Sequence, residues 1–209
     1  DLRRVVLVKH GRGSKLDRTR ITVACDVSNP LCGPNGAAHI FGPQKGATPA
    51  QVEELDHLLN QLARRCDKLR EAEASGAGAA GGLGFAMLAF FGATLRPGFE
   101  IVADAARLRE RLAGVDLCLT GEGRLDHSSF QGKAAVGVAR ICRELNVKCA
   151  AVVGSFDENL TATDRSLFMQ LLPLATSKAM RNEAIQNAAA MLEDRVARAL
   201  SQAPDPARG

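Results

Sequence analysis

A polar stretch at residues 120–133 (TGEGRLDHSSFQGK) carries side chains that suit phosphate and metal binding. Arg124 and Lys133 are positively charged, so either can hold phosphate oxygens. Glu122 and Asp126 can each bind Mg²⁺ or accept the proton of a substrate hydroxyl. These four residues are the main chemical candidates of the stretch, and the two acids are its candidate metal ligands.

The same stretch also contains glycines and hydroxyl groups. Gly121 and Gly123 let backbone N–H groups approach an anion closely, and a helix that follows would add the positive end of its dipole. Ser128 and Ser129 add hydroxyls that can hydrogen-bond a substrate or a phosphate. An ordinary polar connection between a strand and a helix, with its caps, has a similar composition. Residue types alone leave both interpretations open.

A second polar cluster lies earlier in the chain. Asp26 ends an apolar run, and Asn29 follows in a segment rich in turn residues. This pattern is common in Asx-turns, which is the structural alternative. Lys45 is a candidate point charge for phosphate, while Asn29 and Gln44 are candidates for hydrogen bonds to a hydroxy acid.

Hydrophobic patterns place residues 120–133 between a strand and a helix. Residues 115–119 are an apolar run, and residues 134–145 repeat apolar positions at helical spacing. This alternation continues and predicts an α/β fold, with a parallel, doubly wound sheet of the Rossmann or flavodoxin type over residues 115–203. Ligands bind such sheets beyond the carboxyl ends of the strands. The further elements predicted are strands at residues 148–153 and 169–173 and helices at residues 161–165 and 182–200.

Residues 1–114 are less regular and predict part of a second α/β lobe, with a boundary near Gly114. Thr48 followed by Pro49 predicts the start of a helix that runs to residue 74. Residues 204–209 are rich in Pro, Ala and charge, which predicts a disordered tail. The other elements expected are strands at residues 5–8 and 21–25, an extended segment at residues 93–102, and helices at residues 82–91 and 103–112.

Two nucleotide-binding motifs do not fit the sequence. Gly76, Gly78 and Gly81 match G-x-G-x-x-G, but a charged helix precedes them where a dinucleotide fingerprint needs a strand. We expect instead a tight glycine turn that allows close helix packing or meets an anion. A Walker A motif ending at Lys133 fails because its first glycine is replaced by His127 and its Ser/Thr by Ala134.

Composition argues against several classes of protein. The chain has eight Phe and neither Trp nor Tyr, which disfavours stacking on single-stranded nucleic acid. The net charge of +4 includes +5 from residues 1–20, so about −1 remains for the rest and no basic face is expected. Six cysteines without a C-x-x-C pair disfavour a zinc ribbon and favour a reduced cytoplasm. No apolar run reaches the ~20 residues of a membrane helix.

Three segments together resemble the bacterial glycerate kinases of the two-domain, non-P-loop type. The first segment joins residues 24–38 (ACDVSNPLCGPNGAA) to residues 41–47 (FGPQKGA), the second is residues 76–84 (GAGAAGGLG), and the third is residues 120–126 (TGEGRLD) with Gly132 and Lys133. The chain departs from the family pattern at Ser128, where Gln is usual, and at Ala135 and Ser75, where Pro is frequent. Family members are about twice as long, so the resemblance implies a C-terminal portion that lacks the N-terminal half.

The resemblance implies ATP-dependent phosphorylation of D-glycerate with Mg²⁺, giving 2-phosphoglycerate. It implies that Asp126 and Lys133 are catalytic, with Asp126 either orienting or deprotonating the hydroxyl or binding Mg²⁺. Partners would be ATP and D-glycerate, with a further copy of the chain or an N-terminal half also possible. Two alternatives stay open: a non-catalytic domain that binds a nucleotide or an anionic metabolite, and a kinase for another small hydroxy acid.

Overall fold

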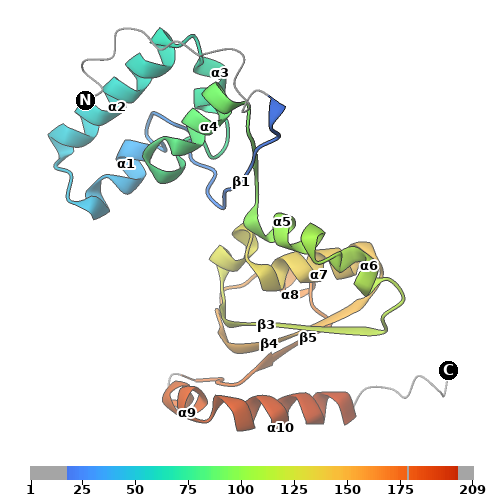
Figure 1. Ribbon diagram of the computed structural model, residues 1–209. Coiled ribbons are helices and arrows are strands. Elements are labelled where there is room, and N and C mark those ends of the chain that lie inside the picture. Colours follow the sequence, from blue (N-terminus) through green and yellow to red (C-terminus); the bar gives the residue numbers. More distant parts are fainter. Residues whose placement is uncertain (1–17, 178, 202–209) are drawn as a thin grey trace. The chain divides into compact units, whose positions relative to one another are not determined.

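The computed structural model describes residues 18–177 and 179–201. The chain divides into two compact units, Asp1–Ile101 and Val102–Gly209 (Figure 1). The boundary predicted near Gly114 therefore falls inside the second unit. The strand predicted at residues 5–8 and the tail predicted at residues 204–209 lie outside the described residues.

The first unit packs helices beside a short parallel sheet. β1 (Thr22–Ala24) pairs with β2 (Thr94–Arg96), with Thr22 opposite Thr94. Its core is built around Leu31, Ala63 and Phe85, which are buried. The helices are α1 (Ala37–Phe41), η3 (Pro43–Lys45), α2 (Pro49–Arg65), α3 (Leu69–Glu73), η4 (Ala79–Gly81) and α4 (Leu83–Phe91), and α5 (Gly98–Ala105) begins in this unit.

The start of α2 is as predicted, but the helix is shorter. The Thr48 hydroxyl accepts the N–H of Gln51, and the Gln51 side chain accepts the N–H of Thr48, which is a capping box. The prediction of one helix to residue 74 is wrong, because Asp67 takes a left-handed conformation with φ of 54°. The separate helix α3 buries Ala72, whose carbonyl accepts the N–H of Leu31.

The glycine-rich segment at residues 76–84 serves close packing between backbones. A Cβ atom at Gly78 would strike the carbonyl of Pro30, and one at Gly84 would strike the carbonyl of Gly76. The segment follows α3, so the G-x-G-x-x-G match lacks the preceding strand of a dinucleotide fingerprint. This is the tight glycine turn expected from the sequence, and α4 follows it.

Residues 93–112 form a short strand and two helices. The extended part is limited to β2, because α5 begins directly after Pro97, and Pro favours the start of a helix. α6 (Leu108–Leu112) is separated from α5 by Arg107, which is left-handed with φ of 51°. The predictions of an extended segment to residue 102 and of a single helix at residues 103–112 are therefore wrong.

The second unit is a three-layer α/β arrangement. β3 (Leu117–Leu125), β4 (Lys148–Phe156) and β5 (Gln170–Pro173) form a parallel sheet in the order β3-β4-β5. The helix α7 (Ala134–Glu144) covers one face, while α9 (Met180–Gln186) and α10 (Ala188–Ser201) lie along the other (Figure 1). The turn η5 (His127–Gln131) links β3 to α7, and α8 (Ala162–Arg165) precedes β5. The α/β fold class with a parallel sheet is confirmed.

The strands β3 and β4 extend further than predicted. The sequence predicts that the first strand ends at residue 119 and the second at residue 153, but pairing continues to Leu125 and Phe156. The glycines permit this, because a Cβ atom at Gly121 would strike the carbonyl of Val152, and one at Gly154 would strike that of Gly123. Glycine here allows two strands to approach closely and does not end them.

The C-terminal helix is broken in two. The prediction of one helix at residues 182–200 is wrong, because Asn187 leaves the helical region with φ of −113° and ψ of 25°. The helix at residues 134–145, the short helix near residues 161–165 and the strand at residues 169–173 are confirmed as α7, α8 and β5. Within the described residues, no helix combines the length and apolar character needed to cross a membrane.

Candidate functional site

Four charged side chains meet where β3 passes into α7. Glu122 and Arg124 lie on β3, Asp126 follows that strand, and Lys133 is the N-cap of α7. The Nζ atom of Lys133 lies 3.7 Å from Glu122 Oε2 and 3.7 Å from Asp126 Oδ1. We call these four residues the β3–α7 cluster. The structure therefore brings together the candidates of the 120–133 stretch.

Asp126 is held in place by its neighbours along the chain. Its Oδ1 atom accepts hydrogen bonds from the Ser128 hydroxyl at 2.5 Å and the Ser128 N–H at 2.9 Å. Arg124 Nε lies 3.7 Å from Asp126 Oδ2. The hydrogen bond from the Ser128 hydroxyl lowers the pKa of Asp126, and the charge of Lys133 acts in the same direction. Asp126 is therefore a carboxylate at neutral pH.

Glu122 is the most enclosed acid of the cluster. Its side chain is 15% exposed, and its Oε1 atom is buried with no hydrogen-bond partner among residues 18–177 and 179–201. A buried carboxylate oxygen without a partner is costly, so it favours a bound cation or donor. Oxygen atoms of carboxylates are the ligands that Mg²⁺ prefers. The pair of Glu122 and Asp126, both in contact with Lys133, therefore fits a magnesium ion.

The two serines of the stretch shape the loop around Asp126. Ser129 is fully buried, and its hydroxyl accepts the Asp126 N–H at 3.1 Å. The same hydroxyl donates to the Arg124 carbonyl at 3.4 Å and accepts from Lys133 Nζ at 3.4 Å. Gly132, left-handed with φ of 119°, ends η5 and leads into α7. Direct contact of Ser128 or Ser129 with a substrate stays a prediction.

Gly121 and Gly123 lie inside β3 and line a groove of about 930 Å³ between the sheet and α9 and α10. A Cβ atom at Gly123 would meet nothing within 4 Å, so this position leaves the groove open. The groove is of the size that binds small molecules. Apolar side chains such as Val152 line it, and the cations Arg124 and Arg181 lie at its wall. Arg181 was not a candidate from sequence, since it sits in an ordinary helix outside any motif.

In the first unit, Asp26 and Asn29 support local structure. Asp26 Oδ1 accepts the N–H of Gly98, the first residue of α5, at 2.7 Å. An ideal Cβ atom at Gly98 would lie 3.1 Å from Asp26 Oδ2, so glycine leaves room for the carboxylate. Asn29 Nδ2 donates to the carbonyl of Asn35 at 2.9 Å. Gly98 was missed because it is far from Asp26 in sequence.

Gln44 and Lys45 form the turn η3, which ends at Gly46 with φ of 88°. Lys45 lines a pocket of about 710 Å³ together with Glu54 and residues of α1 and α2. The candidates of the first unit therefore lie in two settings, the loop after β1 and the turn after α1. The β3–α7 cluster belongs to the other unit.

Comparison with known proteins identifies the family. The glycerate kinase family matches residues 2–203, and the chain belongs to this family. It is 39% identical over 181 residues to the glycerate 2-kinase of Escherichia coli K12, a match that covers 85% of this chain and 48% of the relative. It is 44% identical over 149 residues to the glycerate kinase of Haemophilus influenzae, covering 69% of this chain and 39% of that protein.

A solved structure supports the same assignment. A crystal structure of a glycerate kinase 2 homologue from Salmonella typhimurium LT2 is 38% identical, with a TM-score of 0.66. The match covers 90% of this chain and 50% of that one. The chain spans about half the length of the curated relatives it matches.

Proposed function

We propose that this chain takes part in the ATP-dependent phosphorylation of D-glycerate to 2-phosphoglycerate, as the C-terminal portion of a glycerate kinase. The observation that carries the proposal is the meeting of Glu122, Asp126 and Lys133 at the end of β3, within the region that matches the family. Phosphoryl transfer requires mainly positioning and neutralisation of charge, and this cluster offers both acids and cations.

The proposed role of each residue follows from its side chain. Lys133 and Arg124 would neutralise phosphate oxygens at the β3–α7 cluster, and Lys45 is the candidate phosphate-binding cation of the first unit. Asp26, Asn29 and Gln44 would face the hydroxy acid. Gly123 would leave room in the groove for the nucleotide, since a Cβ atom there would enter open space, and Gly121 would offer its backbone at the same groove.

Glu122 and Asp126 would hold Mg²⁺. Support comes from the buried Oε1 atom of Glu122, which has no hydrogen-bond partner among the described residues. When bound, the ion neutralises charge on phosphate oxygens and orients them. Lys133, in contact with both acids, keeps their charges balanced when they hold no ion.

The lowered pKa of Asp126 bears on its role. A general base works best when its pKa lies near the working pH, so a carboxylate with a depressed pKa is a weak base. Orienting the glycerate hydroxyl and binding Mg²⁺ both require the ionised form, which the Ser128 hydrogen bond favours. We therefore assign Asp126 to positioning and metal binding ahead of proton abstraction.

A cytoplasmic location is part of the proposal. All six cysteines are free thiols in the structure, and free thiols persist where the compartment is reducing.

The test is an assay of ADP release from the 209-residue chain with ATP, Mg²⁺ and D-glycerate. Asp126→Asn should lower kcat by about 10²-fold or more, because it removes a charge at the reacting centre. Asp194→Asn, which changes a surface acid of α10 paired with Arg198, should keep full turnover.

Each alternative predicts a different result in this assay. Nucleotide binding without turnover would favour a non-catalytic domain. Turnover that prefers another small hydroxy acid would favour a different substrate. Full activity in Asp126→Asn would exclude the assigned role.

A further inference from the structure

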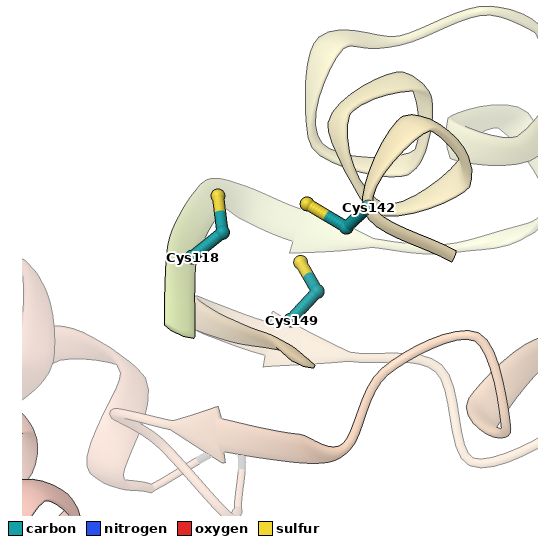
Figure 2. Close-up of side chains that lie close together, drawn as sticks. All are labelled: Cys118, Cys142 and Cys149. Atoms are coloured by element: carbon teal, nitrogen blue, oxygen red, sulfur yellow. The ribbon is translucent and has the colours of Figure 1, made fainter. Parts of the chain in front are cut away.

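Three cysteines that the proposed function does not use converge in the second unit. Cys118 lies on β3, Cys142 on α7 and Cys149 on β4. Their sulfur atoms all lie within 4.8 Å of one another, and Figure 2 shows the three side chains close together. Cys142 and Cys149 are buried, and Cys118 is half-buried.

The topology brings these side chains together. Cys118 is the direct partner of Cys149 in the parallel pairing of β3 with β4, so both side chains leave the same face of the sheet. The helix α7 covers that face and contributes Cys142. The cluster cannot be recognised in the sequence, because cysteines at positions 118, 142 and 149 match no metal-binding motif.

The sulfur separations suit a three-coordinate metal ion. Metal–sulfur bonds of about 2.3 Å in a trigonal plane place the sulfur atoms about 4.0 Å apart. The observed upper limit of 4.8 Å exceeds this separation by less than 1 Å, so small side-chain rotations would close the site. Among the residues that the structure describes, the group consists of these three thiols, with no His, Asp or Glu in it.

The donor set narrows the choice of metal. Thiolate ligands select Cu(I), Zn²⁺ and iron–sulfur clusters. Structural Zn²⁺ takes four ligands, and iron–sulfur clusters are held by four residues, whereas this group offers three. We propose that Cys118, Cys142 and Cys149 form a trigonal binding site for a soft monovalent cation, Cu(I).

Burial keeps the thiols of Cys142 and Cys149 protonated when no metal is bound. It raises the pKa of Cys142 to about 11, and it raises the pKa of Cys149 as well. Binding of Cu(I) therefore releases thiol protons to solvent, as is usual for thiolate sites. The protonated state also makes the free thiols poor nucleophiles, which separates this cluster from a catalytic cysteine.

The test is an anaerobic competition between the 209-residue chain and a chromophoric Cu(I) chelator, bicinchoninate. The wild-type chain should retain one Cu(I), and Cys142→Ala should bind it at least 100-fold more weakly. Cys66→Ala is the matched control, because Cys66 ends α2 in the other unit, and it should bind as the wild type does.

A second variant separates loss of the metal site from misfolding. Cys142 is fully buried, so its replacement could disturb the fold. Cys118 is only half-buried, and Cys118→Ala should show the same loss of Cu(I) affinity with an unchanged far-UV circular dichroism spectrum. Equal Cu(I) affinity in wild type, Cys118→Ala and Cys142→Ala would overturn the proposal. Retention of Zn²⁺ in preference to Cu(I) would overturn the choice of metal. Neither readout depends on kinase activity.

Discussion

Ser128 orients Asp126 and lowers its pKa. The Ser128 hydroxyl and N–H both donate to one carboxylate oxygen, and this lowers the pKa of Asp126. A depressed pKa in the folded state means that the carboxylate contributes to stability above its ordinary pKa. That contribution is lost as the pH falls through the lower, folded-state pKa.

Ser128→Ala should raise the pKa of Asp126 toward its ordinary value. The hydroxyl that favours the ionised form is removed, so protonation should begin at a higher pH. The acid-induced loss of this stabilisation should move to a higher pH in parallel. The measurement is a ¹³C NMR titration of the Asp126 carboxyl carbon.

The control for this titration is Ser166→Ala. The Ser166 hydroxyl donates to the Thr163 carbonyl on α8, and Ser166 is not among the groups that shift the pKa of Asp126. It should leave the Asp126 titration unchanged. An unshifted titration in Ser128→Ala would mean that Lys133 and the backbone N–H groups of residues 128 and 129, and not the Ser128 hydroxyl, lower the pKa of Asp126.

At this scale, the sequence pointed to the charged candidates but not to their partners. Glu122, Asp126 and Lys133 are candidates because their types are unusual together in a short stretch, and the structure places them near one another. Gly98, which donates to Asp26, and Arg181, which lines the groove, were not found. Both have ordinary sequence surroundings, and only the folded chain brings them near a candidate residue.

At the scale of elements, glycines decide where backbones can touch. Gly78 has ordinary φ and ψ of −74° and −7°, so its backbone conformation does not require glycine. Glycine is required at this position because a Cβ atom would strike the Pro30 carbonyl. The N–H of Gly78 also donates to the Asn29 carbonyl at 2.9 Å.

Gly78→Ala should lower the free energy of unfolding by about 1–3 kcal/mol, the usual cost of overpacking. Urea unfolding followed by far-UV circular dichroism measures the change. Gly123→Ala is the matched control for stability, because its Cβ would enter open space, and it should change the free energy of unfolding by about 0.5 kcal/mol or less. A Gly78→Ala chain as stable as the wild type would indicate a role other than packing.

Hydrophobic periodicity predicted most elements but not their interruptions. The breaks at Asp67, Arg107 and Asn187 each fall within or beside apolar patterns that continue at helical spacing. Two of these residues, Asp67 and Arg107, have a left-handed backbone. Arg is an ordinary helix former, so its residue type does not indicate a break in the helix. Strand ends were misjudged for a related reason, since Gly121 and Gly154 resemble turn residues but lie in paired strands.

At the scale of the whole molecule, each unit has its own core. One core gathers around Leu31 and Phe85 in the first unit, and another around Val152 and Leu172 in the second. The second unit also contains a parallel sheet covered by helices on both faces, which is a complete layer arrangement.

A fragment of residues 98–209, which keeps α5 whole, should therefore fold alone. The amides of Val152 and Val153, in the central strand β4, should exchange with solvent about 10³-fold more slowly than in an unfolded chain. Hydrogen exchange followed by NMR provides the measurement, and the 209-residue chain provides the reference. Unprotected amides in the fragment would show that the sheet depends on residues before position 98.

The hydrogen bond from Gly98 to Asp26 means that this carboxylate is occupied before any ligand arrives. The helix it serves, α5, begins in one unit and ends in the other. A carboxylate oxygen has two lone pairs, so a ligand at Asp26 either shares this oxygen with the first N–H of that helix or competes with it. Where it competes, the N–H loses its acceptor, and binding at Asp26 then costs part of the stability of the connecting helix.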